Sequence, residues 1–272
     1  MKTIQTYILF FFLIVSSLSC SHQYYAPNAP IMLKLSDKKE FKVSAAAPGA
    51  FQVGYSPLNR LAVAGSFFTA HQTNSNQSFN LREGKGHLGV GAIGFYHFFE
   101  KNKNTASDGK PSSNNSLAPI GLLIDVYGGY GQGKVENNFS SGGNSSFSIQ
   151  QYFIQGGIHF KSKYFDAGMV YKQSVLNYYD GLLLGEIDFF EETRVQQILD
   201  NNPYNISEVS LHAAAGVNYL KAFWNLNILL NNANRLILES NPIDLNIGIM
   251  VELNEMLSLS KGSKKINKRR KK

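Results

Sequence analysis

The sequence contains one cysteine, Cys20, so the chain can form no internal disulfide. Charged residues are scarce as well: they make up 17% of the chain, against roughly 25% in typical soluble proteins. The apolar run at residues 7–15 is shorter than the roughly 20 residues that a transmembrane helix needs. These scarcities exclude a disulfide scaffold and an N-terminal membrane helix, and the low charge indicates an unusual surface.

Known catalytic spacings are absent too. The chain has no HxH, HExxH or GxSxG sequence, so it indicates neither a zinc hydrolase nor a serine hydrolase. Residues 128–133 include a GxGxG sequence, but a polar loop sequence follows it where a phosphate site needs a helix. These glycines therefore favour a bendable strand end. The sequence predicts no enzyme, no cofactor and no metal.

The N-terminus has the plan of an export signal. Lys2 precedes the apolar run, small residues follow it, and residues 1–19 are predicted to be removed. Residues 17–20 (SLSC) resemble a bacterial lipoprotein processing site, although the usual Leu stands one place later than in the strict pattern. The resemblance implies that Cys20 carries diacylglycerol and an N-linked acyl chain such as palmitate. An ordinary signal with an incidental cysteine is the alternative.

Three segments follow the signal. Residues 20–40 are predicted to be a lipidated, proline-containing tether, and residues 41–253 a single β-barrel domain. Residues 254–272 are predicted to form a basic, disordered tail, in which 261–272 hold eight Lys or Arg and no acid. The tail is either simply solvated or binds anionic lipid, lipopolysaccharide or peptidoglycan by charge. Nucleic acid is not an expected partner for an exported chain.

Alternation of apolar and polar residues, typical of strands, governs the predicted domain. It marks ten runs, near 41–47, 50–55, 60–71, 86–99, 118–134, 147–161, 163–176, 207–219, 221–231 and 243–253. We therefore predict an all-β fold, a single antiparallel up-and-down barrel of eight to ten strands with tight turns at one end and long loops at the other. The helix predicted at residues 188–201 lies within the longest loop, with Asp188 as its cap.

The alternation fits either a membrane barrel or a soluble barrel. Two features favour the membrane: the polar face is made mainly of Gly, Ala, Ser and Asn, and aromatic residues gather at the tight-turn ends of the strands beside cations. The aromatic residues are Tyr55, Tyr96, Phe98, Phe99, Phe160, Tyr164, Phe165, Tyr219, Phe223 and Trp224, and the cations are Arg60, Lys101, Lys161, Lys163 and Lys221. Against it, the last run ends at Leu253, whereas outer-membrane barrels commonly end in Phe or Tyr.

Seven ionisable residues fall on the polar face of the predicted strands and could meet in the lumen: Asp125, His159, Asp166, Glu208, His212, Asp244 and Glu252. They predict either a metal, proton or substrate site, or a hydrogen-bonded network that balances Lys42 and Lys172. An even strand number would put both chain ends at the tight-turn end.

Several segments resemble a known group of proteins: SCSHQYYAPNAP, GYSPLNRLAV, DVYGGYGQGKVEN, QYFIQGGI, KYFDAGMVYK and SVLNYY. They are similar to uncharacterised lipoproteins of Bacteroidetes-type bacteria, which look like outer-membrane β-barrel proteins. The resemblance implies an exported barrel lipoprotein bound to outer-membrane lipid through Cys20. Residues 21–23 lack the acidic residues of surface-displayed relatives, which implies the periplasmic leaflet and periplasmic termini.

The expected role is structural, ligand-binding or that of a small pore. Two alternatives remain: a soluble, lipid-anchored periplasmic barrel that binds a lipophilic ligand, and a barrel enzyme that modifies envelope lipids.

Overall fold

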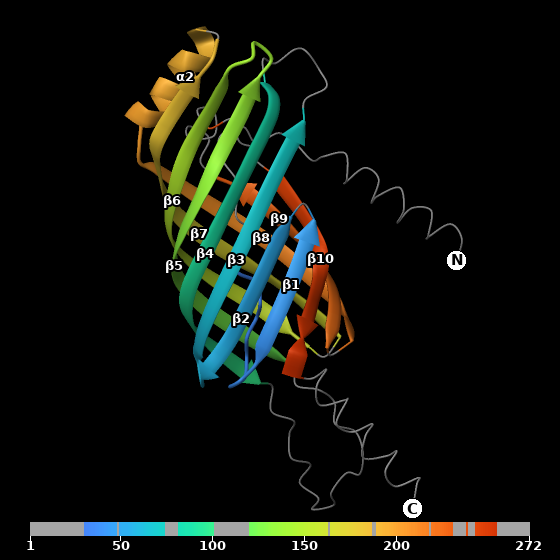
Figure 1. Ribbon diagram of the computed structural model, residues 1–272. Helices are drawn as coiled ribbons and strands as arrows, with labels where there is room; N and C mark the ends of the chain where they lie inside the picture. Colours follow the sequence, from blue (N-terminus) through green and yellow to red (C-terminus); the bar gives the residue numbers. More distant parts are fainter. Residues whose placement is uncertain are drawn as a thin grey trace, which may run out of the picture.

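The structure is a computed structural model that describes residues 30–47, 49–73, 81–100, 120–162, 164–186, 189–217, 219–230, 238 and 243–254. It is a closed barrel of ten antiparallel strands in chain order, which confirms the predicted fold and sets the strand number (Figure 1). The strands are β1 (Phe41–Ala47), β2 (Ala50–Leu58), β3 (Leu61–Thr73), β4 (Leu81–Glu100), β5 (Gly121–Phe139), β6 (Asn144–Lys161), β7 (Phe165–Leu184), β8 (Tyr204–Val217), β9 (Leu220–Leu229) and β10 (Ile243–Glu252).

Pairing of β1 with β10 closes the barrel, with Lys42 opposite Glu252 at the tight-turn end. The predicted helix is confirmed as α2 (Phe189–Asp200), although Asp188 lies outside the described residues. Several strands run further toward the α2 end than the alternation predicts. Residues 135–139 and 144–146, read from the sequence as a loop, continue the ladder between β5 and β6, because their Asn and Ser side chains do not disturb backbone pairing.

At the α2 end, an apolar cluster covers the lumen side of β5–β8. Val195 and Ile198 of α2 pack against inward-facing residues of β5–β8, which are Val135, Phe147, Ile149, Leu176, Tyr178, Tyr204 and Ile206. The Tyr204 hydroxyl donates to the Ile198 carbonyl at 3.1 Å and so ties the helix to β8. Within the described part of the chain, no helix is long and apolar enough to cross a membrane.

An N-terminal segment occupies the lumen. Residues 30–36 lie inside the barrel, where Ile31, Leu33 and Leu35 are almost fully buried against inward residues of β3–β6. The predicted tether is therefore wrong from Pro30 onward, and we call residues 30–36 the plug. Its side chains find partners far away in the chain, which sequence periodicity does not reveal. The described chain thus begins within the lumen and not at the tight-turn end; residues 1–29 and 255–272, including Cys20 and the basic tail, lie outside the description.

Candidate functional site

The plug is held by two glutamines from opposite walls of the lumen. The Gln155 side chain of β6 accepts from the Ile31 amide at 3.0 Å and donates to the Ile31 carbonyl at 2.9 Å. Gln52 of β2 accepts from the Met32 amide at 3.1 Å and donates to the Pro30 carbonyl at 2.8 Å. All four bonds go to main-chain atoms. The lumen therefore recognises an extended backbone here.

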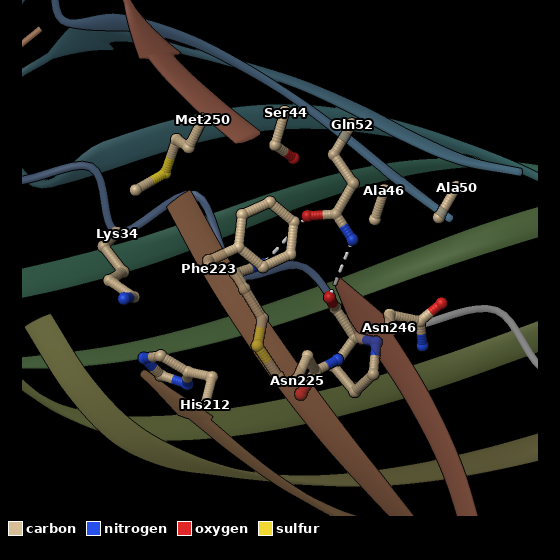
Figure 2. Close-up of a pocket in the computed structure, with 12 residues that line it drawn as sticks. Lys34, Ser44, Ala46, Ala50, Gln52, His212, Phe223, Asn225, Asn246 and Met250 are labelled. Atoms are coloured by element: carbon tan, nitrogen blue, oxygen red, sulfur yellow. Dashed lines mark hydrogen bonds between the residues drawn. The ribbon is translucent and has the colours of Figure 1, made fainter. Parts of the chain in front are cut away.

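The plug faces two different walls of the lumen, one apolar and one that contains a pocket. Leu33 packs toward the apolar β3–β6 wall, and Gly54 of β2 leaves it room, since a Cβ at position 54 would lie 2.5 Å from a Leu33 methyl carbon. On the other side, Met32 and Lys34 border a pocket against β8–β10 (Figure 2). In that view Lys34 and His212 lie at one end of the pocket and Asn246 at the other.

Three of the predicted residues form a buried chain of hydrogen bonds. His159 Nε2 lies 3.0 Å from Asp125 Oδ2, and His159 Nδ1 lies 3.4 Å from His212 Nε2. If the Asp125 carboxylate accepts from His159 Nε2–H, then His159 Nδ1 accepts from His212 Nε2–H. His212 Nδ1 is then a lone-pair acceptor, and it has no protein partner.

Two glycines leave room for the hydrogen-bonded side chains of Asp125, His159 and His212. A Cβ at Gly157 would lie 2.3 Å from His159 Nε2, and a Cβ at Gly168 would lie 2.7 Å from His159 Nδ1. Both distances are too short for a side chain without movement of the imidazole. The glycines at these inward positions are therefore part of the site.

We expect Gly157→Ala to destabilise the barrel by about 1–3 kcal/mol, because the added methyl group overpacks the buried Asp125–His159 pair. Gly156→Ala is a matched control on the adjacent residue, where a Cβ meets only one atom, a carbonyl oxygen at 3.8 Å. Urea unfolding of both variants measures the difference. Equal stability of the two would contradict a tightly packed His159.

All seven predicted lumen residues face inward, but they form separate groups. Beside the Asp125–His159–His212 chain, Asp166 lies 2.7 Å from Lys221 Nζ and Glu208 lies 3.2 Å from Lys172 Nζ. The Asp244 carboxylate accepts from Asn246 at 2.9 Å. Glu252 lies 3.6 Å from Lys42. The structure thus pairs Lys42 and Lys172 with carboxylates, as the network interpretation predicts.

A charged cluster near the tight-turn end contains four residues that the sequence analysis did not place in the lumen: Lys34, Glu40, Lys161 and Lys221. Glu40 lies 2.6 Å from Lys42 Nζ and 3.2 Å from Lys161 Nζ. Burial opposes ionisation of Glu40, but these ammonium groups and the hydrogen bonds from Lys42 and Ser36 outweigh it and hold the pKa of the carboxyl well below its usual range. Glu40 therefore stabilises the fold above about pH 4.5, and this contribution fades only in stronger acid.

The predicted ring of aromatic residues with adjacent cations needs correction. Lys161 and Lys221 turn into the lumen, where buried carboxylates bind them. Three of the aromatic residues, Tyr96, Phe98 and Phe223, also point inward. Six others are exposed on the outer surface: Tyr55, Phe99, Phe160, Tyr164, Phe165 and Trp224. Lys101 and Lys163 lie outside the described residues.

The outer surface carries a continuous apolar band near the tight-turn end. Cross-strand pairing joins one row of outward side chains over six strands, β5–β10: Ile124, Ile158, Met169, Leu211, Leu226 and Leu245. Many outward residues in this band are highly exposed, such as Ile154 at 59% and Phe95 at 67%. Isolated exposed apolar residues are ordinary on soluble proteins, but a band that encircles several strands is not.

The alternation reverses along the strands. On β6 the outward residues Ser146, Ser148 and Gln150 are polar, whereas Tyr152, Ile154, Ile158 and Phe160 are apolar. The inward residues change in the opposite sense, from Phe147 and Ile149 to Gln151, Gln155 and His159. On β5 the outward residues likewise change from apolar Ile124 and Val126 to polar Lys134 and Glu136. The α2 half thus has the plan of a soluble barrel and the other half that of a membrane barrel.

Among the described residues, no group of three or more His, Asp or Glu side chains is arranged to hold a metal ion. No known family model matches the chain, and no curated protein is detectably similar to it in sequence.

Proposed function

We propose that this chain is a membrane-spanning β-barrel of the bacterial outer membrane, with a structural or binding role and a lumen closed by its own plug. The reversal of the alternation is the observation that carries this proposal. On β6 the apolar outer stretch covers residues 152–160, which matches the 9–11 residues of a tilted membrane strand. Tyr130 and Tyr152 pair at its upper edge with ring centroids 5.0 Å apart, where interfacial aromatic residues are favoured.

The same observation weighs against a soluble lipid-carrying barrel. Such a protein needs a charged outer surface and an apolar lumen, and the half that faces the tight turns has the reverse of both. The buried Asp125–His159–His212 chain is a hydrogen-bonded network inside the lumen. The processing-site sequence at residues 17–20 and the resemblance to barrel lipoproteins support lipidation of Cys20, with the lipid as a second attachment to the same membrane.

Membrane integration without the lipid is the deciding test. We expect Cys20→Ala to stay in the membrane pellet after a carbonate wash and to migrate differently in SDS gels before and after boiling. An apolar band alone would retain it, because burial of exposed apolar residues in lipid is favourable. Complete release of Cys20→Ala by carbonate, with wild type retained, would overturn the proposal in favour of a lipid-anchored soluble barrel.

A further inference from the structure

The plug fits one wall of the lumen and fails to fit the other. Toward β3–β6 its leucines pack against apolar side chains. Toward β8–β10 it leaves the pocket, where three buried acceptors have no protein partner: His212 Nδ1, Asn225 Oδ1 and Asn246 Oδ1. The side chains of all three are at least 96% buried.

These acceptors form one row across adjacent strands. His212 of β8 pairs directly with Asn225 of β9, and Asn225 pairs with Asn246 of β10. The amide nitrogens of the two asparagines donate to Asn227 Oδ1 and Asp244 Oδ2, so their oxygens are left for the pocket. An unsatisfied buried acceptor is destabilising, and water satisfies it. The row is therefore suited to a hydrated lumen and poorly suited to a permanently dry one.

The plug itself carries signs of reversible binding. Four of its anchors are neutral hydrogen bonds between its backbone and the side-chain amides of Gln52 and Gln155, each of which donates one bond and accepts one. Its salt bridge joins Lys34 to Asp166 at 3.9 Å, whereas Asp166 has a closer partner in Lys221. Lys42 Nζ also donates to the Lys34 carbonyl at 2.8 Å and Lys161 Nζ to the Ser36 hydroxyl, but both lysines would keep Glu40 as a partner without the plug. Lys34 also has a left-handed φ of 49°, which is unfavourable for a residue with a side chain. Release of the plug would relieve this strain and leave Asp166 paired.

We propose that residues 30–36 are a displaceable gate, and that the barrel conducts small hydrophilic cations when the plug leaves the lumen. This inference rests on the proposed membrane insertion. The vacated space is that of one extended peptide, so only ions and small solutes fit. Cations are favoured because, once Lys34 leaves, the lumen residues whose side chains the structure describes include four lysines (Lys42, Lys161, Lys172 and Lys221) and six carboxylates (Glu40, Asp125, Asp166, Glu208, Asp244 and Glu252).

A reversible lock tests the gate. The Cβ positions of Leu33 and Gly54 lie 3.5 Å apart, which is within the range of a disulfide. Leu33→Cys with Gly54→Cys, in a Cys20→Ser chain that has no other thiol, should fix the plug when oxidised and free it when reduced. In planar bilayers we expect the oxidised protein to be silent and reductant to restore brief, cation-selective openings.

A second variant loosens the plug without touching the pocket acceptors. Gln52→Leu with Gln155→Leu removes the four hydrogen bonds between these glutamines and the plug backbone. The open probability should rise at least about tenfold over wild type, since each such bond contributes measurably to stability. Gln150→Leu, an outward residue of the same strand as Gln155, is the control and should behave as wild type.

Each result is decisive. Equal conductance of the oxidised and reduced lock, silence of the loosened variant, or anion-selective openings would overturn the gate as proposed. Gel shift on boiling and carbonate resistance are measured on the same preparations. If the protein is integrated into the membrane but its conductance does not depend on the disulfide, only the gate is contradicted. If the protein never integrates, the proposed function is contradicted.

Discussion

Replacement of Ile154 by lysine is expected to prevent stable insertion of the barrel into a bilayer. Ile154 lies inside the apolar outer stretch of β6, two residues from Tyr152 at its edge, and is one of the most exposed residues of the band. A lysine costs about 2–4 kcal/mol at the bilayer midplane of such a barrel and less toward the interface, so this range is the upper bound at position 154. In vesicle refolding, the fraction of protein that shifts on boiling should fall at least several-fold.

Ser148→Lys supplies the matched control. Ser148 is also outward on β6, six residues closer to the α2 end, where the outer surface is polar. Insertion of this variant should equal that of wild type. If both lysines impair insertion alike, or neither does, the apolar band is not a membrane surface.

Asp166→Asn is expected to have the largest effect among the lumen residues. Asp166 lies 2.7 Å from Lys221 and 3.9 Å from Lys34, and its other carboxylate oxygen accepts from the Ser162 amide at 3.2 Å. Loss of its charge leaves two buried ammonium groups uncompensated, which costs about 3–5 kcal/mol. The midpoint of urea unfolding of the refolded barrel measures this loss.

Glu136→Gln is the control for charge removal in itself. Glu136 binds Lys134 at 2.6 Å, yet both side chains are about half exposed, so loss of this pair should cost under about 1 kcal/mol. Addition of Lys34→Met to Asp166→Asn should recover part of the stability, since it removes one uncompensated charge. A similar loss for Asp166→Asn and Glu136→Gln would show that the lumen is well hydrated at this end even with the plug in place.

The strands could be predicted because their signal is local. Alternation along each run predicted the ten strands, and Asp188 as an expected cap predicted the start of the helix that is α2. The inward direction of His159 and His212 follows from the same alternation. Lys161 is two residues from inward His159, and Lys221 is four residues from inward Asn225, so the alternation places both lysines inward as well. They were instead predicted to lie at the membrane interface, because aromatic residues stand beside them in the sequence.

The plug could not be predicted in this way. Ile31, Leu33 and Leu35 do alternate with Met32 and Lys34, but the run is short and follows a proline-containing segment typical of a tether. Its partners, Gln52 and Gln155, are 20 and 124 residues away along the chain. The reversal of the apolar and polar faces on β6 is visible in the sequence as the adjacent polar pair Gln150–Gln151. Which of the two faces points to the lumen is known only from the closed barrel.

The position of β6 in the membrane can be measured by the accessibility of spin labels along the strand. Single cysteines at the outward positions from Ser146 to Phe160, in a Cys20→Ser chain refolded into vesicles, can carry spin labels whose collisions with oxygen and with a water-soluble nickel complex are compared. If the apolar band lies in the membrane, labels at positions 146, 148 and 150 are exposed to water and labels from position 154 to 158 are exposed to lipid. Nickel access at every outward position of β6 would contradict membrane insertion of the band.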